Sequence, residues 1–515
     1  MMKLRSISVV MALAVPLSLA CAQDAASSPQ TDNQQAQQSP PAEGASNQLP
    51  PNQAPDNQPP VNVGLGSTEN PPISGLDLPN LEPHAAPLSY LQPGVHVSES
   101  VDSNIADTLG GSSAGSISRG EGSLELQRLW SHYDLSLDYL GGVGYYNVRG
   151  IGLKQVEELG FYQKVTWKRG EFGVRDAFSY QPEGTFGSAY GSVGATGAGL
   201  SELGGFFGGS ALGSLGQVPR VTNLTLADAV ETLSPKSAVT ATVGYGFLHF
   251  LQNDPETGSS FIGGSQISGQ LGYSRVLGPH DQGAVVYGYQ GFQFSTGVTF
   301  HSNVLQLMWG HRISGRMDFL AGAGPQFTEI NHFLTPVNFS PTDTFPPCIL
   351  SSSGVECPRN DLRISAAGQA RLRYQFPRTA LSLSYKHYLT SGSGFFAGAE
   401  SDIATLDVTR PINRVWDAVA DIGYSRNSRV TPNGCTASLP ADCPGVSADI
   451  YQYGFAGIGV HRMFGRSFHA FASYQFNDLI FDSSYCGTTG TCNRISQRQV
   501  GTIGLDWIPR PIRLD

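Results

Sequence analysis

Apolar residues alternate with small or polar ones along the stretch Val239-Thr240-Ala241-Thr242-Val243-Gly244-Tyr245-Gly246-Phe247. A period of two residues puts the valines, Tyr245 and Phe247 on one face of a β-strand and the threonines and glycines on the other. The stretch is also long enough to cross a bilayer as a tilted strand, which takes about 9–11 residues. It therefore predicts a membrane-spanning strand with one lipid-facing side and one water-facing side.

The same alternation recurs from Tyr90 to Ile508, and it predicts an all-β fold: a transmembrane, antiparallel, up-and-down β-barrel of about 18 strands. Short, often basic turns alternate with generally longer loops rich in Gly, Ser and Asn. Segment 222–233 also carries apolar residues at helical spacing, so a smaller even count of 16 strands is the alternative. The predicted strands are 90–100, 118–131, 133–146, 153–167, 171–180, 222–233, 238–250, 266–276, 283–295, 302–312, 317–330, 363–376, 380–389, 402–409, 415–425, 451–463, 467–480 and 497–508.

The composition suits packed strands with a lipid-facing side. Charged residues make up 14% of the chain, against about 25% in soluble domains, and glycine supplies 62 of 515 residues. The formal net charge is −10, and an acidic chain argues against nucleic acid as a partner. The competing interpretation is a secreted sandwich or propeller, which would show shorter strands or a signature repeated in each unit. We find neither feature in the sequence.

The beginning of the chain predicts export from the cytoplasm. Residues 1–22 combine a basic start, an apolar run and small residues before Gln23, which is the pattern of a secretory signal peptide. The alternative treats Cys21 as a lipoprotein cysteine, but Ser18 stands where a lipobox has leucine. Residues 23–88 are rich in Pro, Gln and Asn and predict a disordered periplasmic arm, because they bury too little apolar surface to fold. The barrel is predicted over residues 89–515.

Six cysteines remain after the signal peptide, in three pairs that are close in sequence and fall in the longer loops. Six cysteines allow 15 connectivities, but only local pairing keeps each disulfide within one loop. Disulfides indicate an oxidising compartment, and the spacings do not fit a zinc site, so no metal or cofactor is expected. The predicted disulfides are Cys348–Cys357, Cys435–Cys443 and Cys486–Cys492.

Short motifs resemble those of Gram-negative outer-membrane β-barrel porins, including the barrels encoded beside exopolysaccharide export genes. Pro93-Gly94-Val95, followed by Glu99-Ser100-Val101-Asp102-Ser103-Asn104, is similar to the first strand of these proteins. Leu233-Ser234-Pro235-Lys236-Ser237 is similar to one of their periplasmic turns. The resemblance implies an outer-membrane location, with the N-terminal arm in the periplasm and the long loops outside the cell.

Charged residues at inward positions are the candidate pore lining. A barrel of 18 strands leaves an aqueous lumen, and opposed charges on its wall would produce a transverse field that orients polar solutes. The alternative is that these charges pair across adjacent strands and only neutralise one another. The candidate residues are Arg371, Arg373, Lys386, Asp407, Asp417, Asp421, Asp134, Asp138, Lys164 and Arg175.

Two further hypotheses concern a loop and an enzyme. The Gly-rich loop 181–220 follows the fifth predicted strand, where general porins fold a loop inward, although an external mobile loop is the other interpretation. The match Gly111-Ser112-Ser113-Ala114-Gly115 lacks the strand–turn–helix context of a nucleophile elbow, and the histidines are scattered. The sequence therefore predicts that the protein is not an enzyme.

The sequence predicts an outer-membrane channel for the passive passage of small polar solutes. One alternative is a conduit for exopolysaccharide export. Another is a structural or adhesive barrel with a closed lumen. The expected partners are outer-membrane lipid and either small polar solutes or a polysaccharide, and the sequence indicates no oligomeric state.

Overall fold

The computed structural model describes most of the predicted barrel. The predicted signal peptide 1–22, the predicted arm 23–88 and nearly all of loop 181–220 lie outside the described residues. No helix among the described residues is long and apolar enough to span a membrane. The described ranges are 89–105, 109–111, 113–148, 152–181, 219–251, 261–334, 349–351, 354–392, 394–431, 448–489 and 492–514.

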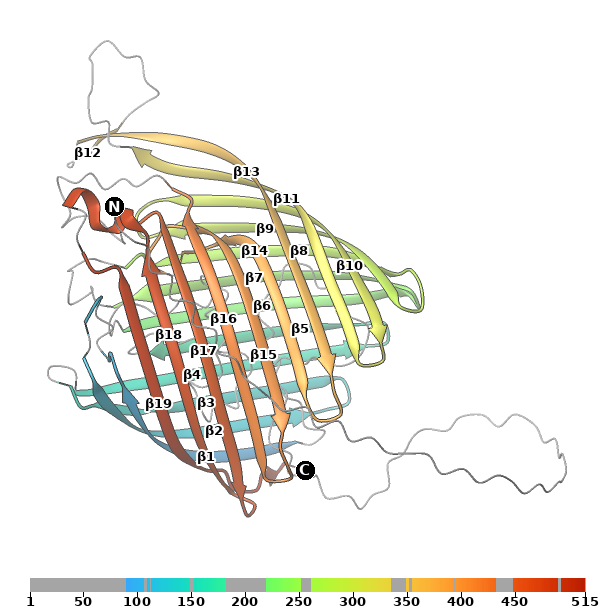
Figure 1. The fold of residues 1–515 in the computed structure, drawn as a ribbon. Coiled ribbons are helices and arrows are strands. Elements are labelled where there is room, and N and C mark those ends of the chain that lie inside the picture. Colours follow the sequence, from blue (N-terminus) through green and yellow to red (C-terminus); the bar gives the residue numbers. More distant parts are fainter. Residues whose placement is uncertain are drawn as a thin grey trace, which may run out of the picture. The chain divides into compact units, whose positions relative to one another are not determined.

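Eighteen long strands form a closed, antiparallel, up-and-down barrel (Figure 1). Each strand pairs with its neighbours in the sequence, and the barrel closes where β1 pairs with β19, with Val95 opposite Trp507. Two short strands, β12 (Ile349–Ser351) and β20 (Ile512–Arg513), add to β13 and β1. The long strands are β1 Tyr90–Asp102, β2 Gly115–Leu129, β3 Tyr133–Tyr146, β4 Gly152–Trp167, β5 Gly170–Gln181, β6 Arg220–Ser234, β7 Ser237–Phe250, β8 Gly264–Val276, β9 Asp281–Phe294, β10 Thr299–Ser314, β11 Met317–Leu334, β13 Gly354–Gln375, β14 Ala380–Thr390, β15 Ala399–Pro411, β16 Trp416–Arg429, β17 Ile450–Phe464, β18 Phe468–Phe481 and β19 Ile495–Trp507.

The predicted fold class and the count of 18 are confirmed, and the alternative of 16 is wrong. The ambiguous segment 222–233 forms β6, which pairs with β5 and β7 along its length. Its apolar residues at helical spacing are divided between the two faces of the strand, with Leu226 buried on the inner one. The largest difference is β13, which begins at Gly354 rather than near residue 363 because it forms a hairpin with β12.

Large apolar side chains cover the outer face of the barrel. Leu307 is 67% exposed, Val97 58% and Ile267 50%, and each alternates with a buried or polar neighbour. Residues of one parity in every strand therefore face outward, as the pleat requires. An exposed apolar belt of this extent would be costly in water and matches the hydrocarbon region of a bilayer. The protein is thus a membrane-spanning β-barrel.

The tryptophans mark one boundary of the belt. All five in the chain lie near the short-turn rim, where tryptophan prefers the interface between lipid and water. Two arginines stack on aromatic rings there: Arg128 lies 5.1 Å from the Trp130 ring centre, and Arg462 lies 5.1 Å from that of Trp416. This rim also holds the ends of β1 and β19, so both ends of the barrel segment lie on the same side.

Candidate functional site

The ten charged residues proposed as pore lining all occupy lumen-facing positions. The register fixes this side, because exposed apolar residues occupy the opposite parity of the same strands. They form two groups on separate arcs of the wall. Asp134 and Asp138 lie on β3, Lys164 on β4 and Arg175 on β5, whereas Arg371 and Arg373 lie on β13, Lys386 on β14, Asp407 on β15, and Asp417 and Asp421 on β16.

The arc from β13 to β16 changes from basic to acidic. Arg373 donates from Nε to Asp318 Oδ1 on β11 at 2.9 Å, so its charge is shared with a neighbouring strand. Asp407 and Asp421 lie directly opposite each other on β15 and β16. Reasoning from the sequence missed Asp318, because it becomes a partner only when β11 and β13 are in register.

In the arc from β4 to β6 the opposite charges lie in contact. Arg175 donates to Asp228 Oδ1 on β6 at 2.5 Å, and this pair is largely buried. Lys164 Nζ lies 3.9 Å from Glu171 on β5, in a more exposed pair. Asp228 and Glu171 were also missed, for the same reason as Asp318. These contacts support mutual neutralisation in this arc, so the strongest charge contrast lies near β15 and β16.

A pair of carboxyl groups lies on β2 and β3, beside the β4 to β6 arc. Glu125 on β2 faces Asp138 directly across the β2–β3 ladder. The Tyr90 hydroxyl donates to Glu125, and Ser136 Oγ donates to Asp138 Oδ2 at 3.3 Å. Hydrogen-bond donors from β1 and from β3 itself thus offset part of the repulsion between two acidic groups on the wall.

Uncharged amide and hydroxyl groups line the wall between the charged arcs. Within the described residues, no lumen-facing position of β7, β8 or β9 carries Asp, Glu, Lys or Arg. Gln326 donates from Nε2 to Ser302 Oγ at 2.8 Å, and Thr328 donates to the same oxygen at 3.2 Å. Amides and hydroxyls both donate and accept hydrogen bonds, so they suit uncharged polar solutes. The lumen-facing glutamines of this region are Gln266, Gln270, Gln290, Gln306 and Gln326.

The loop between β14 and β15 folds into the lumen. We call residues 391–398 the inward loop; all but residue 393 are described. Ile262 N, just before β8, donates to Gly394 O at 2.8 Å, although four barrel strands separate β8 from β14. Phe395 packs on the other side against Tyr451 of β17 and Phe481 of β18, with ring centres 5.2 and 5.3 Å away. The loop therefore connects distant parts of the wall across the long-loop end of the barrel.

Two aromatic clusters hold the inward loop. In one, Phe395 and Phe396 are 0% exposed against Tyr451, Phe455 and Phe481. The second cluster lies on the inner face of β9 to β11 and includes Phe292, Phe294, Phe300 and Ile330, with Ala397 of the loop and Leu389 of β14. Burial of several aromatic side chains at about 150–250 Å² each is a large apolar contribution. The long-loop end of the lumen is therefore narrowed by a packed apolar layer.

Glycine permits the close approach of the loop to the wall. Gly392, Gly394 and Gly398 all have positive φ angles, of 80°, 85° and 84°. A Cβ on Gly398 would lie 1.9 Å from the Phe300 ring, and one on Gly394 would lie 2.6 Å from Phe250. Both the backbone conformation and the packing therefore require glycine at these positions.

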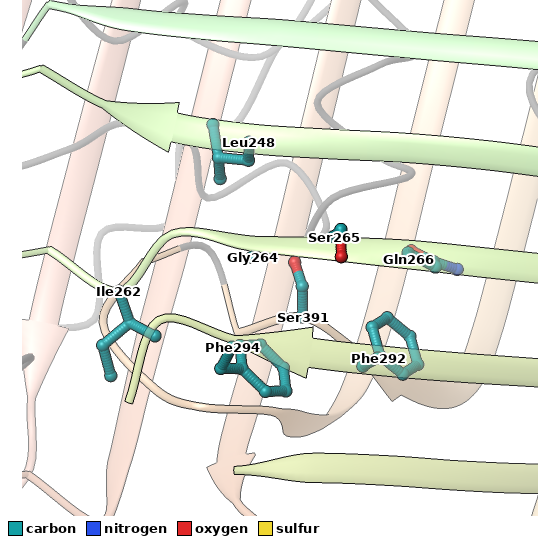
Figure 2. A pocket seen from close by; sticks show the side chains of 8 residues that line it. All are labelled: Leu248, Ile262, Gly264, Ser265, Gln266, Phe292, Phe294 and Ser391. Carbon is teal, nitrogen blue, oxygen red and sulfur yellow. The ribbon is translucent and has the colours of Figure 1, made fainter. Parts of the chain in front are cut away.

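A small cavity remains between the loop and the wall (Figure 2). Leu248, Ile262, Phe292 and Phe294 supply its apolar lining, and Ser391 reaches it from the loop. Its lining is mainly apolar, so the cavity is a packing defect beside the aromatic cluster rather than a polar binding site.

A serine, a histidine and an aspartate lie in contact at the closure of the barrel, which is the set of groups that acyl transfer uses. Ser123 Oγ lies 2.8 Å from His96 Nε2, and His96 Nδ1 lies 2.9 Å from Asp506 Oδ1. Acyl transfer also needs N–H donors aimed at the developing oxyanion. The backbone around these residues takes part in the β1–β2, β2–β3 and β1–β19 ladders. The contact connects three strands at the barrel closure.

Two further histidines lie on the lumen side near these residues: His461 Nδ1 lies 3.7 Å from Asp417 Oδ2, and His469 lies opposite Asp506. His301 and His249 occupy outward positions, and His301 Nδ1 contacts the Tyr289 hydroxyl at 2.9 Å. His387 lies in a network at the barrel wall, whereas His469 faces the lumen beside Asp506. In the described part of the chain, no group of three or more His, Cys, Asp or Glu residues could hold a metal ion.

Of the proposed disulfides, the described residues contain Cys486–Cys492, with the two Cα atoms 5.4 Å apart. Cys486 lies within a 3-10 helix, Ser483–Thr489, and Cys492 follows that helix. Tyr485 of the helix stacks on Phe481, with ring centres 4.7 Å apart. Cys348, Cys435 and Cys443 lie outside the described residues. Cys357 belongs to β13, in a segment that the sequence predicted to be a loop.

Comparison with solved structures returns outer-membrane β-barrels. The siderophore receptor PiuA from Acinetobacter baumannii aligns at a TM-score of 0.43 and 9% identity, over 81% of this chain and 70% of that one. The E. coli K12 ferric-catecholate import receptor Fiu gives 0.39 and 8%, over 81% of each chain. Pseudomonas aeruginosa OccK2 (OpdF), in complex with glucuronate, gives 0.36 and 8%, over 82% of this chain and 98% of that one. At these values the likeness carries no argument about a substrate. No protein-family model and no curated protein matches the chain.

Proposed function

We propose that this outer-membrane barrel is a channel for the passive passage of small polar solutes. The observation that carries the proposal is the polar lumen-facing side of the strands, set against the apolar belt on the outer side of the same strands. A barrel of this strand number is wide enough for an aqueous path.

The wall also indicates which solutes fit. The amide and hydroxyl surface of β8 to β11 can exchange hydrogen bonds with neutral solutes, and Asp407 and Asp421 favour cations among charged ones. The inward loop narrows the path, so solutes with small cross-sections are favoured. No described feature supports polysaccharide export over uptake of small solutes.

Single-channel recording in a planar lipid bilayer tests this proposal. The purified full chain is expected to produce discrete current steps, and these should grow when residues 392–397 are replaced by a shorter glycine linker that cannot reach Tyr451. If neither protein gives current above that of the empty bilayer, the channel is rejected and a barrel with a closed lumen takes its place. Current steps that loop shortening leaves unchanged would reject the inward loop as the narrowest point.

A further inference from the structure

The barrel wall is incomplete between β13 and β14. β13 pairs with β11 from Leu334 opposite Cys357 down to Met317 opposite Tyr374. Its pairing with β14 covers only Gly368 to Gln375. Above Gly368, residues 362–367 have no strand partner on the β14 side among the described residues. We call the gap between residues 362–367 and the end of β14 the side window.

The side window arises because β14 turns into the lumen. The last residues of β14 continue to pair with β15, with Leu389 opposite Glu400, but no longer with β13. By parity Leu389 would face lipid, yet it is only 5% exposed and packs with Phe300 and Ile330 on the inner face of β10 and β11. The tip of the β14–β15 hairpin, which carries the inward loop, therefore lies on the lumen side of β10 and β11.

The window lies at the long-loop edge of the apolar belt. Leu362 and Ile364, on the β13 edge, are 69% and 66% exposed and lie opposite Glu329 and Phe327 of β11. A bare strand edge is excluded from hydrocarbon, because its unpaired N–H and C=O groups cost several kcal/mol each, and it is tolerated only beside water or protein. Water, protein side chains or a polar ligand must therefore satisfy the backbone groups of residues 362–367.

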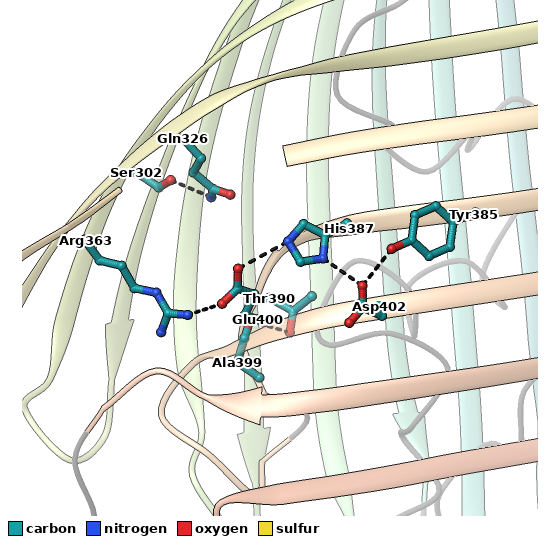
Figure 3. A network of polar contacts seen from close by, with 9 residues as sticks. All are labelled: Ser302, Gln326, Arg363, Tyr385, His387, Thr390, Ala399, Glu400 and Asp402. Atoms are coloured by element: carbon teal, nitrogen blue, oxygen red, sulfur yellow. Dashed lines mark hydrogen bonds and ion pairs between the residues drawn. The ribbon is translucent and has the colours of Figure 1, made fainter. Parts of the chain in front are cut away.

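A polar network lies at the window (Figure 3). Arg363 of β13 contacts Glu400 of β15 and so crosses the position that β14 would occupy in a continuous sheet. His387 Nε2 lies 3.2 Å from Glu400, and its Nδ1 lies 2.8 Å from Asp402. The Tyr385 hydroxyl donates to Asp402 at 2.8 Å. The charged and imidazole side chains of this network remain 20–42% exposed, so they form an accessible group rather than a sealed core.

We infer that the side window is a lateral passage between the lumen and the outer leaflet for a single-chain amphiphile, with the Arg363–Glu400 contact as its latch. The polar head would pass along the charged network, while the acyl chain would remain in the lipid beside Leu362 and Ile364. On the lumen side, Ser302 and Gln326 continue the polar surface (Figure 3).

An amphiphile fits this site better than a wholly polar solute. The aromatic clusters occupy the outer end of the lumen, so the window offers a sideways route at a height where the axial one is narrowed. One flank of the route is charged and the other is apolar and exposed, which matches a molecule with a head and a tail. A wholly polar solute would gain nothing from the apolar flank.

Photo-crosslinking in lipid vesicles tests this inference. p-Benzoylphenylalanine would replace Ser365, a lumen-facing residue on the window edge, in the full chain. The matched control replaces Thr242, which is also half-buried and lumen-facing but lies on β7, paired on both sides. The probe is alkyne-labelled lysophosphatidylcholine, and folding of each variant is checked by its heat-dependent shift in gel mobility.

We expect labelling at position 365 to exceed that at position 242 at least about fivefold, because only the former borders a route from lipid. Adding Arg363→Ala should increase labelling at 365 and leave 242 unchanged. Equal labelling at the two positions, or no increase on loss of Arg363, would overturn the passage. Crosslinks between two protein chains at 365, without lipid, would also overturn it in favour of an interface between copies. The result does not depend on ion conduction, so it is separable from the proposed channel function.

Discussion

Arg498 and Asp102 form a buried ion pair beside the closure of the barrel, between the last long strand and the end of the first. Arg498 Nε donates to Asp102 Oδ2 at 2.6 Å, and the two side chains are 5% and 0% exposed. Because the residues lie 396 positions apart, the contact forms only when the ends of the sheet meet. It therefore reports directly on closure.

Asp102→Asn should destabilise the barrel by about 3–5 kcal/mol, because it leaves the buried Arg498 charge without its counterion. Urea unfolding in lipid vesicles, followed by tryptophan fluorescence, measures the change. Lys164→Met removes the half-exposed pair with Glu171 and should change stability by no more than about 1 kcal/mol. Equal effects of the two substitutions would mean that the buried closure pair contributes no more to stability than the exposed pair does.

Gly398→Ala should release the inward loop and raise single-channel conductance. The new Cβ would lie 1.9 Å from the Phe300 ring in a backbone with φ of 84°. Gly465→Ala is the matched control, because Gly465 has φ of 69° but a Cβ added there would meet no atom within 4 Å. The control incurs only the left-handed backbone penalty of about 1–2 kcal/mol and should leave conductance unchanged. Similar conductance in both variants would contradict the packing of the loop.

Replacing both Asp407 and Asp421 by asparagine should reduce the preference of the channel for cations. The two carboxylates face each other on adjacent strands, so they act on the same part of the path. The reversal potential under a KCl gradient measures the preference. Glu231→Gln, an outward position near the short-turn rim, is the control and should leave the potential unchanged. A potential that responds only to the control would place the ion path elsewhere.

Cys486→Ser combined with Cys492→Ser should lower stability by about 2 kcal/mol in the chain-entropy model, since the closed loop is short. We expect faster proteolysis of the segment 483–492 in intact cells, with the rest of the barrel protected. Addition of a reductant should reproduce this result in the native protein and have no further effect on the variant. Proteolysis of the barrel strands themselves would show that the bond stabilises more than its own loop.

The strands could be predicted from the sequence because their signal is local. A period of two, bounded by turn residues, located every long strand, and the same parity assigned Asp407 and Arg371 to the lumen side. The ambiguous segment 222–233 was resolved only by pairing on both flanks, which no local pattern contains.

The inward loop and the side window could not be predicted, because both depend on contacts between distant strands. Phe395 and Phe396 lie among glycines in a loop. Two aromatic residues in such a loop were the one sequence feature that indicated a buried loop. Their partners Tyr451 and Phe481 are distant in sequence and come into contact with them only in the closed barrel. Similarly, the pairing between β13 and β14 stops at Gly368, and the alternating sequence of β13 gives no sign of this. Charge partners such as Asp318 required the register.

Accessibility scanning along β15 distinguishes the lipid-facing side of the wall from the water-facing side. Spin labels would be placed singly at residues 404–409 of the protein in lipid vesicles, and collision with oxygen and with a water-soluble nickel complex would be measured. We predict a period of two, with 404, 406 and 408 reached from lipid and 405, 407 and 409 reached from water. Equal accessibility at successive positions, or exclusion of both reagents from 405, 407 and 409, would contradict a barrel that is apolar outside and wet inside.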